Sequence, residues 1–341
     1  MAICEGFSME RAGPTTADRQ ELDPFPDGWY VVEESDRLPA GKLVEKQWMG
    51  REIVAWRDSA GDVCVADAIC PHLGAHLGPD GGGKVSGDCL VCPFHGFEYD
   101  TGGKCVATPN GPPPRSAQLD RFEVTECNGF VFAWHHRGDQ APTWRPQEVS
   151  AVNRARSLAV LRVRAHPQTI TENSVDSAHL AHVHGYRELE QVAATQVDGP
   201  VLRSSYAFSR NMLTSGLAPL ELSVQIAIEV RGLGVSTVII EGRSGFRVRQ
   251  WVLSTPVDGD LIDVWLVIDV ERLPRWRWLR GPLAALGWAV MPRLFLNELV
   301  LEVRKDAEIW RRQGYRPRPV LSGADRDILR FRRYCEQFYA T

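Results

Sequence analysis

Short strand-like runs separated by turn residues fill the N-terminal part of the chain. The clearest pair is 122–127 and 130–134, which flank Asn128-Gly129, and a second pair surrounds the turn residues at 59–61. Asn-Gly between two such runs is a strong hairpin signal, because both residues tolerate the positive φ angles of a tight turn. This pattern predicts an N-terminal all-β domain.

The second half of the chain has longer strand-like runs and also helical segments. Gly- or Pro-containing turns separate the runs, as expected for an antiparallel sheet. The runs are 158–165, 222–230, 235–240, 246–253 and 261–270. A short helix is expected around 172–182 and a longer one at about 294–312. We therefore predict an α+β chain whose second domain is helix-grip-like, with a curved antiparallel sheet around helices.

Composition along the chain suggests where the domains meet. Residues 137–150 include Pro142 and Pro146 and form a predicted linker. The predicted parts are an arm at 1–26, a β domain at 27–140 and a second domain at 141–341. The arm has no apolar core behind a basic start, so we do not expect a secretory signal.

Composition and charge indicate a soluble globular protein. Of the 341 residues, 44% are hydrophobic and 24% are charged, and the net charge is only −4. That charge gives no reason to expect nucleic acid, whose binders carry concentrated basic surfaces. The most apolar stretch, 281–296, contains Pro292 and Arg293 and is shorter than the roughly 20 residues that cross a bilayer. We expect a cytoplasmic protein that binds a small molecule and protein partners.

Two short loops each offer one thiol and one imidazole. Cys70 and His72 stand two positions apart, and Cys92 and His95 stand three positions apart. Two thiolates and two imidazoles suit either tetrahedral zinc or a [2Fe–2S] cluster with cysteines on one iron and histidines on the other. Cys89, three residues before Cys92, could complete the CxxC half of a zinc site. The spacing alone leaves both metals open.

The residues around these four resemble the cluster-binding loops of Rieske proteins. The two loops read C-P-H-L-G-A-H and C-P-F-H-G. The ligands implied for a [2Fe–2S] cluster are Cys70, His72, Cys92 and His95. Imidazole ligands raise the reduction potential of such a cluster above that of an all-cysteine cluster, which makes it an electron relay. The resemblance gives His76 and Cys89 no ligand role, and we expect both to be structural.

A second group of metal-binding residues lies around the predicted short helix. Asp176 and His179 share one face of a helix, whereas His184 lies about 140° around the axis from His179. For both histidines to bind one metal, the helix must end between them, and Gly185 supplies a stop. On geometry alone His182, three residues after His179, competes as the second ligand.

The spacing Asp-x-x-His-x-x-x-x-His resembles the mononuclear iron motif of Rieske oxygenases. The resemblance implies that His179 and His184 bind Fe(II). It also implies that Asp176 bridges to a cluster histidine of the neighbouring subunit, so that electrons cross between subunits. Such a path requires a ring of subunits, commonly a homotrimer.

A third iron ligand must come from elsewhere in the chain. Two histidines on Fe(II) are usually joined by one carboxylate, which leaves positions open for O₂. The segment from Asp306 to Trp310 resembles the family segment that carries this ligand, so we choose Asp306. Glu302, one turn earlier on the same helix face, is the reserve, whereas Glu308 would point away.

The resemblance covers nearly the whole chain and is strongest to the steroid-oxidising branch of Rieske oxygenases, which includes cholesterol 7-desaturases and 3-ketosteroid 9α-hydroxylases. It implies a steroid or sterol substrate, O₂ as oxidant, and electrons from a separate ferredoxin or NAD(P)H-dependent reductase. Desaturation and hydroxylation both begin with removal of a hydrogen atom from carbon, so both remain candidate reactions, with desaturation preferred. The alternative class is a Rieske electron carrier whose second half is only a binding module.

The segment 272–291 combines basic and tryptophan residues with an apolar run. This composition is typical of elements that lie on a membrane surface. Peripheral membrane contact is therefore one hypothesis for this segment, and the others are that it covers the substrate cavity or packs between subunits.

Overall fold

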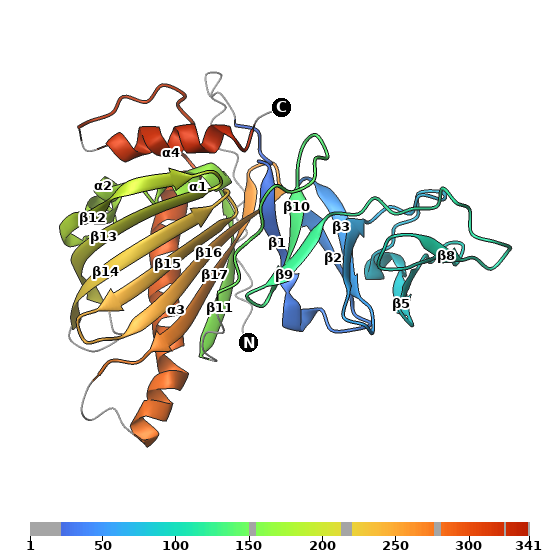
Figure 1. Cartoon of the computed structure of the whole chain (residues 1–341), viewed down its shortest axis with the longest axis horizontal. Coiled ribbons are helices and arrows are strands. Elements are labelled where there is room, and N and C mark those ends of the chain that lie inside the picture. The colour runs from blue at the N-terminus through green and yellow to red at the C-terminus, as the bar shows by residue number, and fades with distance from the viewer. Residues whose placement is uncertain (1–21, 150–154, 213–219, 276–280, 324, 340–341) are drawn as a thin grey trace.

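The computed structural model describes residues 22–149, 155–212, 220–275, 281–323 and 325–339. Figure 1 shows small sheets formed by the first part of the chain beside one large sheet formed by the second part. This all-β beginning, followed by an antiparallel sheet with helices, confirms the predicted α+β fold class.

Three small antiparallel sheets make up the N-terminal part, with strand orders β1-β10-β9, β2-β3-β4 and β5-β6-β7-β8. The strands are β1 (Gly28–Glu34), β2 (Leu43–Trp48), β3 (Arg51–Arg57), β4 (Val63–Asp67), β5 (Lys84–Ser86), β6 (Cys89–Val91), β7 (Glu98–Tyr99), β8 (Cys105–Ala107), β9 (Val124–Cys127) and β10 (Phe130–His135). The predicted Asn-Gly hairpin is confirmed, since Cys127 pairs with Phe130 and the φ angles of Asn128 and Gly129 are 55° and 83°.

One seven-stranded antiparallel sheet organises the C-terminal part, in the order β11-β17-β16-β15-β14-β13-β12. The strands are β11 (Arg156–Arg164), β12 (Arg187–Asp198), β13 (Val201–Met212), β14 (Leu220–Arg231), β15 (Val235–Gly242), β16 (Arg247–Asp258) and β17 (Leu261–Arg272). The sequence did not predict β12 and β13. In β12 only Thr195 is buried, so its apolar residues show no alternation that would reveal a strand.

Four helices accompany this sheet among the described residues. They are α1 (Pro167–Glu172), α2 (Ser177–His182), α3 (Pro282–Trp310) and α4 (Arg326–Glu336). α3 packs against β11 and β17 and runs along the face of the sheet, while α4 lies across one end (Figure 1). The sheet-facing side of α3 is apolar, with Leu299 and Val303 at most 5% exposed.

The helix predicted around 172–182 begins later than expected, as α2, and α1 lies before it in the chain. α1 ends at Glu172 and α2 begins at Ser177. Between them Asp176 is the N-cap of α2, and its side chain accepts a hydrogen bond from the His179 amide at 3.2 Å. A carboxylate at the N-cap satisfies an amide that has no partner within the helix. The break therefore comes from a capping residue inside the predicted helix.

The prediction that 281–296 is too short to cross a bilayer is wrong in its premise, because Pro292 does not interrupt the helix. α3 runs through Pro292 without a break and is 29 residues long in total. By length and composition alone it could cross a membrane. Its most apolar 18-residue window is 11% buried. A proline removes one backbone hydrogen-bond donor from a helix. Where the neighbouring packing is good, this loss bends the helix more often than it ends it.

The two parts of the chain share a hydrophobic core. Trp29 of β1 packs with Trp251 of β16 and Trp265 of β17, and none of the three is more than 4% exposed. The Thr255 hydroxyl also donates a hydrogen bond to the Val31 carbonyl at 3.1 Å. Because this junction is buried and bonded, it fixes how the small sheets sit on the large one.

Gly234 lies where this junction leaves no room for a side chain. A Cβ there would lie 2.4 Å from the Trp29 carbonyl oxygen. We expect Gly234→Ala to lower the free energy of unfolding by roughly 1–3 kcal/mol, as overpacking usually does, measured by urea denaturation. Gly323→Ala is the matched control, because a Cβ there meets nothing within 4 Å. Equal stabilities of the two variants would contradict this explanation.

His166 is the N-cap of α1 and is bonded as a neutral ring. Its Nδ1 accepts from the Gln168 amide at 3.1 Å, and its Nε2 donates to the Asp23 carbonyl at 2.8 Å. Burial lowers the pKa of His166 to about 4, even though the contacts with Asp23 act to raise it. A second proton on the ring would remove the acceptor that caps α1.

The lowered pKa makes stability depend on pH. An unfolded chain binds the proton with a pKa of about 6.5, so stability is complete above that pH and falls as the pH drops toward 4. Relative to neutral pH, we expect a loss of about 2 kcal/mol at about pH 5, measured by urea unfolding. His166→Asn keeps a capping side chain without this titration, so its loss over the same interval should be smaller. An equal loss in the variant would assign the effect to other groups.

Candidate metal centres

The two Cys/His loops share one backbone turn. In each loop, the glycine four residues after the cysteine donates to the cysteine carbonyl at 3.0 Å, from Gly74 to Cys70 and from Gly96 to Cys92. The φ angles of these glycines are 76° and 65°, a conformation that strains other residues. The glycines are therefore needed for the shape of the loops, independently of any ligand.

The loops bury both of their thiols and expose one of their two imidazoles. Cys70 and Cys92 are each 2% exposed, whereas His72 is exposed and its ring lies 4.7 Å from that of His95. Burial raises the pKa of the Cys70 thiol, and the neighbouring Cys92 acts in the same direction. A thiolate that is buried in this way needs a positive charge beside it, and the iron ions of an iron–sulfur cluster would supply that charge.

Tyr99 is a further residue of this centre that the sequence did not reveal. Its hydroxyl lies 3.2 Å from Cys70 Sγ, and its side chain is completely buried. Burial raises the pKa of Tyr99 far above its ordinary value, so the phenol stays protonated. It can therefore donate a hydrogen bond to a thiolate at Cys70.

His76 has other partners than the four predicted ligands. Its Nδ1 accepts from the Gly78 amide at 3.1 Å, and its Nε2 lies 3.4 Å from Glu52. Glu45 lies on the other side of the ring, 3.9 Å from Nδ1. These contacts agree with the structural role expected for His76.

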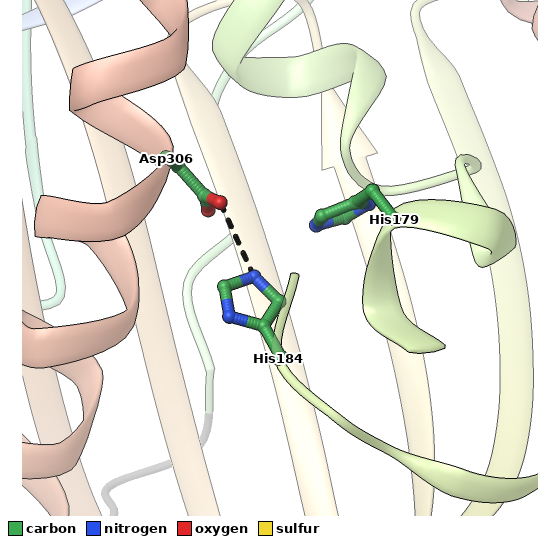
Figure 2. Close-up of side chains that lie close together, drawn as sticks. All are labelled: His179, His184 and Asp306. Carbon is green, nitrogen blue, oxygen red and sulfur yellow. Dashed lines mark ion pairs between the residues drawn. The ribbon is translucent and has the colours of Figure 1, made fainter. Parts of the chain in front are cut away.

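The second predicted group of ligands comes together in space. Figure 2 shows His179, His184 and Asp306 pointing toward one another, from α2, from the segment after it and from α3. Their ligand atoms all lie within 4.8 Å of one another, and His184 Nε2 is 3.3 Å from Asp306 Oδ1. The His179 and His184 rings are 5.1 Å apart. Two imidazoles and one carboxylate in this arrangement form a donor set that suits Fe(II).

The end of α2 explains how His184 reaches the site. α2 stops at His182, the Gly185 amide bonds to the Ala181 carbonyl at 3.1 Å, and Gly185 has a φ of 70°. A residue with positive φ just past the last turn ends a helix. His184 lies beyond the last residue of α2, so the 140° or so that would separate it from His179 on an ideal helix does not apply, and the two rings meet.

Hydrogen bonds orient two of the three side chains. His179 Nδ1 lies 2.6 Å from the Asp176 carbonyl, which can only accept, so Nε2 carries the free lone pair. Asn173 Nδ2 donates to Asp306 Oδ2 at 3.2 Å and leaves Oδ1 to face His184. Both bonds leave one ligand atom free to point at a common centre, so the residues present fit a bound iron.

The competing ligands lie elsewhere. His182 is exposed and does not join the group, although helix geometry had favoured it. Glu302 accepts hydrogen bonds from Tyr186, and Glu308 pairs with Arg311 at the surface. Of the carboxylates considered, only Asp306 therefore meets the two histidines.

A mainly apolar cavity adjoins the three residues. Side chains from four strands and α3 line it, including Phe208, Ile226, Ile228, Val238, Phe246 and Leu299. His179, His184 and Asp306 form part of its wall. A hydrophobic molecule in this cavity would thus lie directly beside the group.

The two centres lie at opposite ends of one chain. In Figure 1 the strands β5 and β8, which belong to the small sheet next to the Cys/His loops, stand at one extreme, and α2 stands near the other. The side chain of Asp176, at the start of α2, is 29% exposed. The two centres are therefore built by different parts of the chain.

Comparison with known proteins agrees with both centres. Residues 28–124 match the Rieske [2Fe-2S] domain, and residues 133–339 match the 3-ketosteroid 9alpha-hydroxylase C-terminal domain. The second match covers more than half of the chain. It favours the predicted oxygenase over an electron carrier with a binding module.

Relatives and solved structures extend this comparison. Cholesterol 7-desaturase nvd 1 of Ciona intestinalis is 29% identical over 94% of this chain and 70% of its own length. The oxygenase component of 3-ketosteroid-9-alpha-monooxygenase of Rhodococcus rhodochrous is 23% identical over 92% of this chain and 84% of its own. The fold is similar to that of dicamba monooxygenase bound to dicamba, with a TM-score of 0.65 and 19% identity over 91% of this chain and 96% of that one.

The two family matches account for the two kinds of centre on one chain. The first covers the thiols and imidazoles of the Cys/His loops, and the second covers the histidines and the carboxylate beside the cavity. The predicted family, enzyme class and cofactors are confirmed. This chain belongs to the Rieske oxygenases, oxidoreductases that carry a [2Fe–2S] cluster and a mononuclear iron, take electrons from a separate donor protein and act on a hydrophobic substrate.

Proposed function

We propose that this oxygenase oxidises a steroid or sterol, most closely in the manner of a cholesterol 7-desaturase. The alternative within the same proposal is hydroxylation like that of the 3-ketosteroid 9α-hydroxylases. The observation that carries the proposal is the similarity along more than nine-tenths of the chain to two relatives that are both named for steroid substrates. The apolar cavity beside the candidate iron site supports it.

The metal ligands are proposed from the geometry and the family resemblance together. The proposed cluster ligands are Cys70, His72, Cys92 and His95, and the proposed iron ligands are His179, His184 and Asp306. His179, His184 and Asp306 would hold an iron with coordination positions left open, and that iron would supply the O₂ activation needed to remove hydrogen from carbon. The apolar wall excludes water and holds the substrate carbon near this position. We also propose that the domains divide near residue 140, into 27–140 and 141–341, with an arm at 1–26.

The test is product analysis by mass spectrometry. The iron-loaded protein, a surrogate NAD(P)H-dependent reductase and NADH are incubated with a panel of sterols and 3-ketosteroids. Loss of two hydrogens from a sterol would establish desaturation, and gain of one oxygen on a ketosteroid would establish hydroxylation. The control is His184→Ala, which should keep the visible absorption of the cluster and lose all product. No product from any steroid, with both metal sites loaded, would refute the steroid proposal.

We propose a homotrimer in which the cluster of one subunit serves the iron of the next. Support comes from the separation of the two centres within one chain and from the exposed imidazole of His72. Asp176 lies at the surface between α1 and α2, where it could accept a hydrogen bond from a cluster histidine of the neighbouring subunit. Light scattering coupled to size exclusion tests the subunit number.

Asp176→Asn tests the bridge with little change to the fold. Asparagine caps helices about as well as aspartate, so α2 should be retained. We expect both metals to bind and turnover to fall roughly 10- to 100-fold, as when an outer-shell carboxylate is lost. Stopped-flow absorption should show slower reoxidation of the reduced cluster in the presence of substrate and O₂. Unchanged reoxidation and turnover would refute the bridge.

Tyr99→Phe tests the hydrogen bond to Cys70. A donor to a cluster sulfur stabilises the reduced, more negative state, so its removal should lower the midpoint potential. We expect a decrease of roughly 60 mV, equivalent to about 1.4 kcal/mol for one electron, measured by redox titration of the visible spectrum. Tyr30→Phe is the matched control, because its buried hydroxyl bonds to the Pro26 carbonyl. The same shift in both variants would show that the hydrogen bond is not the cause.

We further propose that the protein is cytoplasmic and touches a membrane surface peripherally through the first half of α3. The seven cysteines among the described residues are all free, as is usual for a reducing compartment. The first half of α3 exposes Leu283, Leu286 and Val290, by 49%, 59% and 38%. Of the predicted segment 272–291, residues 276–280 lie outside the described residues. Flotation with anionic and with neutral liposomes tests the contact, and no binding to either would refute it.

A further inference from the structure

α3 carries three carboxylates at four-residue spacing: Glu298, Glu302 and Asp306. Side chains four positions apart lie on the same face of a helix, one turn above another. All three line the cavity, but only Asp306 meets the histidines. Glu302 is one turn from Asp306 and has a longer side chain than Asp306. Some other contact must therefore keep Glu302 from binding the metal as well.

Arg210 of β13 holds both of the remaining carboxylates. Its guanidinium lies 2.7 Å from Glu302 Oε1 and 3.3 Å from Glu298 Oε2. Tyr186 donates a second hydrogen bond to the same Glu302 oxygen at 2.9 Å, and itself accepts one from Arg210 at 3.0 Å. The charged side chains are 13–19% exposed, so water competes little with these bonds.

The residues around Arg210 keep it in place. The Tyr186 ring stacks on Phe208 with a centroid distance of 4.1 Å and an interplanar angle of 16°. The Arg210 guanidinium lies over the Tyr186 ring, 5.1 Å from its centroid. Burial alone would lower the pKa of Arg210, but the nearby carboxylates outweigh it and raise the pKa. The Arg210 guanidinium is therefore held in place and stays positively charged.

A carboxylate released next to a bound divalent iron would be drawn to it, since Fe(II) accepts carboxylate oxygens readily and the cavity offers little water. We propose that Arg210, assisted by Tyr186, is a positioning residue that holds Glu302 away from the iron, so that Asp306 is the single carboxylate ligand and coordination positions stay open. This inference rests on the iron ligands assigned under the proposed function, and it does not depend on the identity of the substrate.

Nitric oxide is a suitable probe, because it needs an open position on ferrous iron and no turnover. The protein loaded with Fe(II) is titrated anaerobically with nitric oxide, and the nitrosyl signal is followed by EPR, with iron content measured in parallel. We expect Arg210→Met to retain the mononuclear iron and to bind nitric oxide about tenfold more weakly. The double variant R210M/E302Q should recover most of the affinity, because an amide is a much poorer ligand for iron.

Three further variants separate this role from a general structural effect. R210M/E298Q also removes one carboxylate charge that has lost its partner Arg210, but it does so at Glu298, one turn further from the iron. It should therefore not recover the affinity for nitric oxide. Tyr186→Phe removes only one bond to Glu302, so it should weaken nitric oxide binding less, again with recovery in Y186F/E302Q. If R210M does not fold, this second pair decides the question.

Wild-type affinity in both R210M and Y186F, or recovery by E298Q as fully as by E302Q, would overturn the inference. Failure of the ligand assignment would look different, since His184→Ala would then retain the nitrosyl signal of the wild type. Failure of the steroid proposal would leave all of these signals unchanged, because no substrate is present in the experiment.

Discussion

The packing of α3 against the curved sheet is the interaction on which the catalytic end of this protein depends. Asp306 lies on the buried side of the helix and reaches His179 and His184 only while that side faces the sheet. The same packing lines the cavity with the apolar residues of α3. Substrate cavity and candidate iron site are thus two consequences of one helix–sheet contact, and α3 can slide or rotate little without losing both.

Placing charged groups in such a cavity has a cost that the structure meets by pairing them. A buried carboxylate without a partner is destabilising. Glu298 and Glu302 have Arg210, and Asp306 has Asn173 on one oxygen and faces His184 with the other. The pairing leaves just one carboxylate with an oxygen directed at the histidines, which is the composition that a mononuclear iron with open positions requires.

At the other end, rigidity matters for a different reason. Electron transfer needs the cluster loops held at a fixed place relative to the catalytic sheet, and the tryptophan core around Trp29, Trp251 and Trp265 joins the two parts of the chain. The loops themselves rest on glycine turns and bury their thiols, while the imidazole of His72 is exposed. This arrangement suits a cluster that delivers electrons across a subunit boundary.

The sequence by itself carried the ligand types and their spacing, which are local properties, and together with the resemblance to Rieske oxygenases these predicted the two Cys/His loops, the motif around His179 and Asp306. It also revealed the other strands of the large sheet, but not β13 and not β12, whose residues are almost all exposed. Only the tertiary structure shows why His184 meets His179 and His182, which ideal helix geometry favoured, does not: α2 ends at His182 and His184 lies beyond it. Arg210 carries no motif at all, and its role exists only because β13 and α3, which are distant in sequence, pack together and bring opposite charges into one buried contact.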